Sequence, residues 1–154
     1  MLFLLMQLDG NRYAIDTREI VEVLPLVDCK AVPGAPAGVA GIIDYGGVPV
    51  PIIDLSELLA GRPAHRRLST RIVLIRRGRA STRQELLGLI AERATDTVRR
   101  DLADFRPSGV ARPTPPHLGG VVLDAAGPVH LIDVGALLPE ALRQALPESA
   151  VSLG

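Results

Sequence analysis

The sequence has few aromatic side chains: its 154 residues include no tryptophan, two tyrosines and two phenylalanines. Proteins that hold single-stranded nucleic acid stack bases on aromatic rings, and nucleic-acid-binding domains in general present a basic face. Neither feature is prominent here, since 17 basic residues are balanced by 17 acidic ones and the formal net charge is zero. The composition therefore argues against nucleic acid as the main partner.

Cysteine and long apolar runs are also scarce. Cys29 is the one cysteine of the chain, so no disulfide can form within it, which is compatible with a reducing compartment. No apolar run approaches the roughly 18 residues of a membrane span. The apolar stretch 2–6 is too short for a signal peptide and lacks a basic region before it, so it is predicted to be a strand. We expect a cytoplasmic protein without direct membrane insertion.

Motifs that carry enzymatic or metal chemistry are missing as well. The three histidines are far apart in the sequence and no cysteine pair or H-E-x-x-H motif accompanies them, so we expect no metal and no cofactor. Asp54 and Asp133 could act as a catalytic base, but no companion motif supports an enzyme. Each stands before a short helical pattern, where an N-cap residue is expected. We therefore predict that the protein has no catalytic residues.

What the sequence does contain is an internal repeat. Residues 41–59, GIIDYGGVPVPIIDLSELL, align without a gap with residues 120–138, GVVLDAAGPVHLIDVGALL. In the first copy the cluster Asp44-Tyr45-Gly46-Gly47 separates two apolar stretches, a pattern typical of a β-hairpin. Asp54 then stands three residues before an acidic residue, which is the spacing of a helix N-cap. Each copy is predicted to be a strand, a turn, a strand and a short helix.

The other strands are short and separated by turns rich in glycine and proline. They are predicted at 3–8, 12–15, 20–26, 71–75 and 85–92, with a helical turn capped by Asp16 and a C-terminal helix at 139–146. The predicted fold is mainly all-β, with two small five-stranded β-barrels related by the repeat, because closure removes exposed sheet edges. Residues 1–62 and 63–154 are the approximate halves of this single domain, and the barrels could exchange elements. The polar connector 61–69 is the best candidate boundary.

These segments resemble the CheW-like family over nearly the whole chain. The family pattern V-x-G-x-I-N-L-R-G, followed by x-x-x-P-(V/I)-x-D-L, stands here as residues 39–47 and 48–55. The resemblance implies two five-stranded barrels with partly exchanged elements. It also implies an adaptor that couples the cytoplasmic tip of a chemoreceptor to the regulatory domain of a CheA-type histidine kinase. Within the family, the chain looks most like coupling proteins of Wsp-type surface-sensing pathways.

The resemblance also implies positions that meet partner proteins, namely Ile20, Glu22, Gly41, Asp44, Gly46, Ile72 and Ala94. Core packing explains the two isoleucines equally well. Asp44 and Gly46 replace the asparagine and arginine of the family pattern, yet the turn is still expected at a partner-facing surface, because its polarity keeps it out of a core. The alternative function is a small-barrel nucleic-acid-binding protein that uses the arginine-rich segment 62–83, which otherwise reads as a solvated loop.

Overall fold

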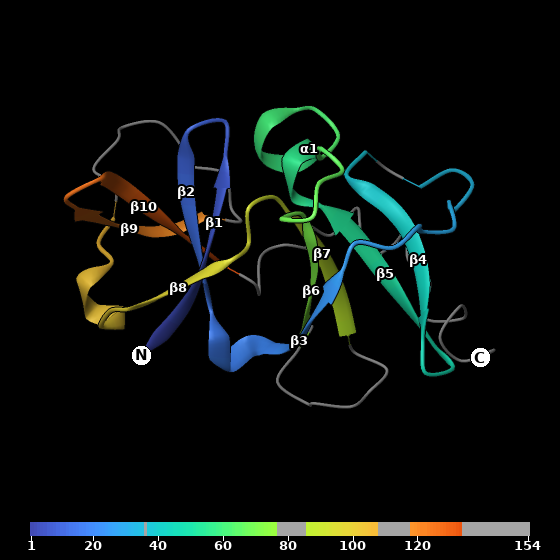
Figure 1. Ribbon diagram of the computed structural model, residues 1–154, viewed down its shortest axis with the longest axis horizontal. Coiled ribbons are helices and arrows are strands. Elements are labelled where there is room, and N and C mark those ends of the chain that lie inside the picture. Colours follow the sequence, from blue (N-terminus) through green and yellow to red (C-terminus); the bar gives the residue numbers. More distant parts are fainter. Residues whose placement is uncertain (36, 77–85, 108–117, 134–154) are drawn as a thin grey trace.

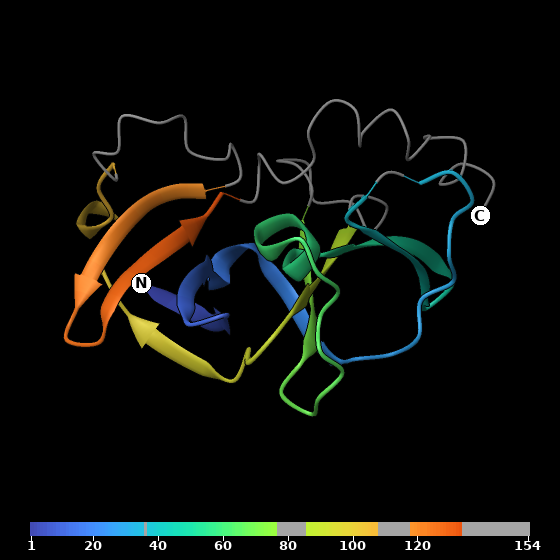
Figure 2. The same ribbon diagram turned by 90° about the horizontal axis from the view of Figure 1, so that it is seen from above.

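The computed structural model describes residues 1–35, 37–76, 86–107 and 118–133, and these residues form two five-stranded sheets (Figure 1). The first sheet has the order β8–β1–β2–β10–β9, with the bounds Asp96–Arg99, Leu2–Leu8, Asn11–Asp16, Gly127–Ile132 and Leu118–Asp124. The second sheet has the order β3–β6–β7–β5–β4, with the bounds Ile20–Pro25, Arg71–Arg76, Leu86–Ala91, Val48–Asp54 and Val39–Tyr45. The helix α1, Leu55–Ala60, lies where the sheets meet (Figures 1 and 2).

The strand pairing confirms the internal repeat. The hairpin β4–β5 of the first copy corresponds to the hairpin β9–β10 of the second. Ile52 on β5 lies opposite Gly88 on its parallel neighbour β7, and Leu131, its counterpart on β10, lies opposite Ala14 on β2. Both sheets therefore have the same order of equivalent strands. Each sheet takes strands from both halves of the chain, since β1 and β2 pair with later strands while β3, β4 and β5 surround β6 and β7.

The expected closure into barrels is wrong for the described residues. There, β8 and β9 remain at the edges of the first sheet, and β3 and β4 remain at the edges of the second. One edge of each sheet is covered by a crossing segment instead, because Lys30 bridges Ile42 on β4 and Arg106 bridges Val121 on β9. Such a segment satisfies some of the backbone hydrogen-bonding groups of an exposed edge strand without closing the sheet.

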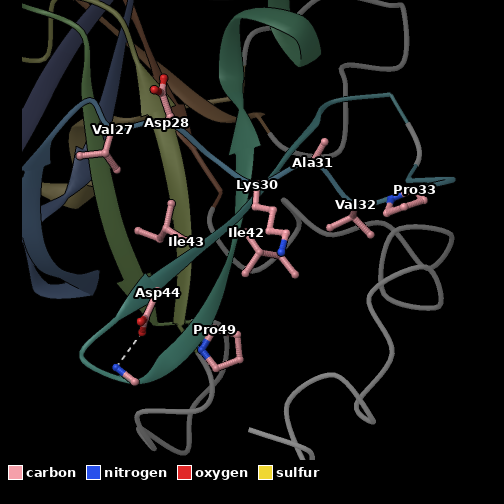
Figure 3. A pocket seen from close by; sticks show the side chains of 11 residues that line it. Val27, Asp28, Lys30, Ala31, Val32, Pro33, Ile42, Ile43, Asp44 and Pro49 are labelled. Atoms are coloured by element: carbon pink, nitrogen blue, oxygen red, sulfur yellow. Dashed lines mark hydrogen bonds between the residues drawn. The ribbon is translucent and has the colours of Figure 1, made fainter.

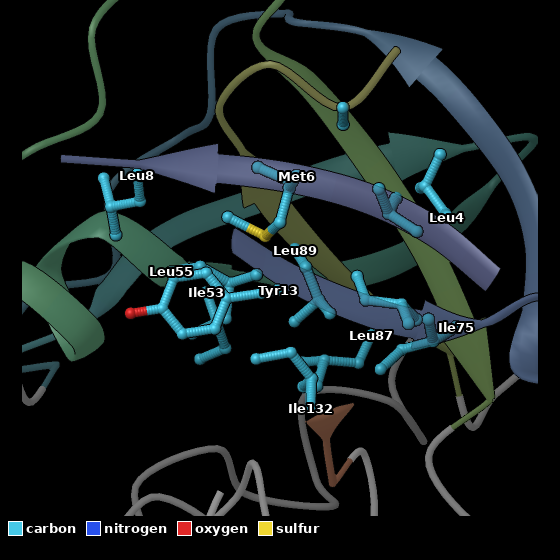
Figure 4. Close-up of a cluster of buried hydrophobic side chains, with 14 residues drawn as sticks. Leu4, Met6, Leu8, Tyr13, Ile53, Leu55, Ile75, Leu87, Leu89 and Ile132 are labelled. Carbon is cyan, nitrogen blue, oxygen red and sulfur yellow. The ribbon is translucent and has the colours of Figure 1, made fainter. Parts of the chain in front are cut away.

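Both faces of the central strands are buried, which explains their nearly continuous apolar sequences. Leu4 and Met6 on β1 and Val73 on β6 belong to a core cluster shared by the two sheets (Figure 4). The alternate residues, Phe3 on β1 and Ile72 on β6, belong to separate clusters of the first and the second sheet. Since side chains alternate along a strand, one strand supplies two cores. The sheets are thus joined by a continuous interior.

Short helical elements begin at the predicted capping residues. Asp16 accepts a hydrogen bond from the backbone of Arg18 at the start of the 3-10 turn Thr17–Glu19, and Asp54 accepts one from the backbone of Ser56 at the start of α1. Both predicted caps are confirmed. A second 3-10 turn, Leu102–Asp104, has no counterpart in the predictions. The predicted cap at Asp133 involves residues outside the described ones, as does the C-terminal helix 139–146. Among the described residues, no helix is long and apolar enough to cross a membrane.

Candidate functional site

A surface groove of about 790 Å³ lies beside the β4–β5 hairpin (Figure 3). Its walls are mostly apolar, and three charged side chains join them. We call it the hairpin groove; its described lining is Val27, Asp28, Lys30, Ala31, Val32, Pro33, Ile42, Ile43, Asp44, Gly47 and Pro49. An open groove with apolar walls and charges of both signs can bind the surface of another protein.

The groove exists because the segment that follows β3 crosses close to β4. The amide of Lys30 donates to the carbonyl of Ile42 at 2.9 Å, and the amide of Ile42 donates back at 2.9 Å. Gly41, just before this bridge, has a φ of +148°. A Cβ atom at Gly41 would lie 2.4 Å from the carbonyl oxygen of Lys30. Only glycine allows the two backbones to approach so closely.

The turn of the hairpin lies at the surface beside the groove (Figure 3). Gly46 and Gly47 both have positive φ, 58° and 87°, as the central residues of a type I′ turn do. The carboxylate of Asp44 accepts a hydrogen bond of 2.7 Å from the amide of Gly47 and is otherwise exposed. Asp44 and Gly46 therefore occupy an exposed tip whose shape depends on the glycines.

Glu22 lies beside this hairpin. Its carboxylate accepts a hydrogen bond from the hydroxyl of Tyr45, the residue next to Asp44. Glu22 is on β3 and Tyr45 is on β4, which are the opposite edges of the second sheet. The contact shows that the sheet curls until its edges approach. It places Glu22 and the Asp44 turn on one surface.

The remaining predicted contact positions are more buried. Ile72 and Ala94 are completely buried, Gly41 is buried, and Ile20 is half-buried against the shared core. The side chains of Ile72 and Ala94 therefore contribute to packing in the isolated chain, because an enclosed methyl group has no surface to present. The structure thus brings Glu22, Asp44 and Gly46 together at the surface and places the other four in or against the interior.

Two arginines of the arginine-rich segment, Arg62 and Arg66, form ion pairs with other parts of the protein. Arg62 pairs with Asp9 and with Glu92, each at 2.7 Å, and Arg66 pairs with Asp28 at 2.6 Å. Burial alone would raise the pKa of Glu92, but hydrogen bonds from Arg62 and from the Ser56 hydroxyl outweigh it and hold that pKa at about 2. These arginines are therefore partly neutralised, which weakens the case for a nucleic-acid-binding surface. Sequence reasoning missed this anchor, since its partners are distant in the chain.

Among the described residues, potential metal ligands do not cluster, and the carboxylate of Asp54 is enclosed. The described residues contain no group of three or more histidine, cysteine, aspartate or glutamate side chains that could hold a metal ion. Asp54 is buried, and its two carboxylate oxygens accept hydrogen bonds of 2.9 Å from the amides of Ser56 and Ala64. Burial raises the pKa of Asp54, and those two hydrogen bonds act against the rise. A carboxylate enclosed in this way is a structural cap, and a substrate could not reach it.

Comparisons with known proteins agree with this fold. Residues 2–142 match the model of the CheW-like domain. The chain is 28% identical over 145 residues to a chemotaxis protein CheW of Bacillus subtilis, covering 92% of this chain and 90% of that protein. The crystal structure of the scaffolding protein TtCheW from Thermoanaerobacter tengcongensis has the same fold, with a TM-score of 0.74, 19% identity, and coverage of 90% of this chain and 87% of that one.

Proposed function

The chain belongs to the CheW-like domain family, and we propose that it is a non-enzymatic adaptor of a chemosensory complex. Its partners are the cytoplasmic tip of a chemoreceptor and the regulatory domain of a CheA-type histidine kinase. The observation that carries the proposal is the family match over residues 2–142. The similar proteins support it, since one is named a chemotaxis protein and the other a scaffolding protein.

The hairpin groove is the surface that suits the kinase domain. Its exposed apolar walls gain free energy when a partner removes them from water, at about 25 cal/mol per Å². Asp44 at its rim adds a negative charge, and Gly46 supplies no guanidinium that could grip a carboxylate in two hydrogen bonds. The matching partner surface is an apolar ridge with a basic or neutral group opposite Asp44. The adaptor acts as a scaffold that holds the kinase and the receptor in a fixed position relative to each other.

The test measures binding to the purified kinase regulatory domain encoded in the same genome. Val27 lines the groove and is 45% exposed, whereas Leu102 lies in the 3-10 turn Leu102–Asp104 and is 43% exposed. The variants Val27→Asp and Leu102→Asp therefore form a matched pair. We expect Val27→Asp to weaken binding by about tenfold or more, because a charge replaces a buried apolar contact, and Leu102→Asp to leave it unchanged. Equal affinities for both variants would contradict the groove as the binding surface, and no binding by the wild type would contradict the coupling function.

A further inference from the structure

Leu68 is completely exposed, at 100% of its accessible surface. It lies in the loop 61–70, called here the Leu68 loop, which follows α1 and projects beside the segment that follows β3 (Figure 2). The amide of Thr70 donates to the carbonyl of Arg67 at 3.0 Å, so Leu68 is the second residue of a tight turn. Such positions usually carry glycine, proline, asparagine, aspartate or serine. Exposure alone assigns no role to a leucine, but its surroundings do.

The Leu68 loop is held by hydrogen bonds on both sides of its turn. Before the turn, the amide of His65 donates to the buried carboxylate of Glu92 at 3.2 Å. After the turn, the carbonyl of Ser69 accepts from the amide of Ala94 at 3.1 Å. A loop that is fixed in this way loses little conformational freedom when it binds a partner, so the leucine is positioned before any contact is made.

The loop adjoins the hairpin groove. Arg66 of the loop pairs with Asp28 at 2.6 Å, and Asp28 lines the groove. The Cα atoms of Arg66 and Leu68 are at most about 7 Å apart, because two residues of extended chain span no more than that. The exposed leucine therefore lies close to the wall of the groove.

The hairpin groove alone is smaller than a stable interface. A standard protein–protein interface covers about 800 Å² and roughly 20–30 residues on each partner, whereas 11 residues line the groove. A disc of about 800 Å² has a radius of about 16 Å. A domain that fills the groove must extend over the adjoining surface, and the Leu68 loop lies within this reach.

Charge does not select a partner on this surface. The groove includes Lys30 as well as Asp28 and Asp44, and Asp28 is already paired with Arg66. The hollow that Arg67 lines also carries charges of both signs. The apolar side chain is the feature that gains from contact, since burying a leucine is equivalent to roughly tenfold or more in affinity.

We infer that the hairpin groove and the Leu68 loop form one continuous surface for the kinase regulatory domain, with Leu68 as its apolar anchor. The inference rests on the proposed function, which assigns the groove to that domain. The matching partner surface offers an apolar pocket for Leu68 beside the ridge that fills the groove. Contacts around such an anchor contribute little by themselves but exclude water from it.

Calorimetry with the full chain and the purified kinase regulatory domain tests the inference. Leu68→Ala should raise the dissociation constant by about tenfold or more. The increase should be the same at low and at high salt, because salt screens charges and not apolar contacts. The matched control is Leu123→Ala, which shortens a leucine that is 76% exposed on β9, an edge strand of the other sheet, and should leave the dissociation constant unchanged. Both variants should unfold like the wild type.

Methyl nuclear magnetic resonance of the labelled chain tests whether the surface is continuous. On titration with the kinase domain, the methyl signals of Val27 in the groove and of Leu68 should shift along the same binding curve, while those of Leu123 should not move. A Leu68 signal that shifts when the protein alone is diluted would assign the leucine to a second copy. One that shifts only with a receptor fragment would assign it to the receptor. Either result would overturn the inference.

The calorimetry distinguishes this inference from the proposed function. If Val27→Asp weakens kinase binding and Leu68→Ala binds like the wild type, the inference is wrong and the proposed function stands. The inference is also wrong if Leu68→Ala and Leu123→Ala weaken binding equally. If the wild type does not bind the kinase domain at all, both fail.

Discussion

Replacing Gly41 with alanine tests whether this glycine shapes the groove or contacts a partner. The new Cβ would lie 2.4 Å from the carbonyl oxygen and 2.8 Å from the carbonyl carbon of Lys30, both of which are backbone atoms. A neighbouring side chain could move aside, but this backbone is held by the paired hydrogen bonds to Ile42. The substitution must therefore break the bridge or displace the strand.

The expected cost follows from two contributions. Overpacking in a well-filled site typically costs about 1–3 kcal/mol, and a residue other than glycine held in an unfavourable φ/ψ region adds about 1–3 kcal/mol. Gly41→Ala should then lower the free energy of unfolding by about 2–6 kcal/mol. Gly10→Ala is the matched control, because Gly10 also has a positive φ, 81°, but no atom lies within 4 Å of the position of its Cβ. It should show the conformational cost alone.

Urea denaturation followed by far-ultraviolet circular dichroism measures both variants. The reasoning predicts that Gly41→Ala is the more destabilising by at least about 1 kcal/mol. If Gly41→Ala is no more destabilising than Gly10→Ala, the close approach of the two backbones is not required by the fold. If its stability is unchanged and kinase binding is lost, Gly41 is a contact residue.

Three further substitutions have expected outcomes. Asp54→Ala should lower stability by about 0.5–2 kcal/mol in thermal unfolding, as the loss of an N-cap does, and should leave kinase binding unchanged. At pH values above the ordinary glutamate pKa, the ion pair of Glu92 stabilises the folded protein, and this stabilisation is lost as the pH falls from about 5 towards the folded pKa of about 2. Glu92→Gln should lack this acid-dependent loss when unfolding is measured at pH 3 to 7. An unaltered loss would contradict the role of this carboxylate. Asp44→Asn combined with Gly46→Arg should improve binding to a non-cognate kinase regulatory domain and weaken binding to the cognate one, and calorimetry that gives equal affinities for all four pairs would show that the turn does not select the partner.

Local patterns in the sequence were sufficient to predict the repeat, the hairpins and the helix caps. The equivalence of the two copies is visible in the pairing of Ile52 with Gly88 and of Leu131 with Ala14. Asp16 and Asp54 cap the elements that they precede. Such features depend on residues a few positions apart, so a sequence window contains all the information that they need.

Features that depend on distant residues were not predictable in this way. The connector 61–69 was predicted as a polar boundary, and its anchoring by hydrogen bonds from Arg62 to residues 53 and 30 positions away could not be predicted. Lys30 covers the edge strand β4 of a sheet that stays open. This contact also joins residues that no local sequence pattern relates. Ile72 fits either a core or a contact surface by residue type, and only the structure shows that it is completely buried.

Among the candidate contact residues, the sequence predicted the exposed positions best. The polar turn at Asp44 and Gly46 was expected at the surface, where the structure places it. The groove beside it could not be predicted, because its walls come from the crossing segment 27–33 and from the hairpin together. A groove of this kind is a property of the packed chain.

The most direct test of the coupling function is co-sedimentation of the kinase with membranes that contain the chemoreceptor. The account predicts that the kinase remains in the supernatant without this protein and moves to the pellet when the protein is added. It also predicts that Val27→Asp abolishes the effect and that Leu102→Asp does not. Kinase sedimentation that is independent of the protein, or that is equally supported by both variants, would contradict the account.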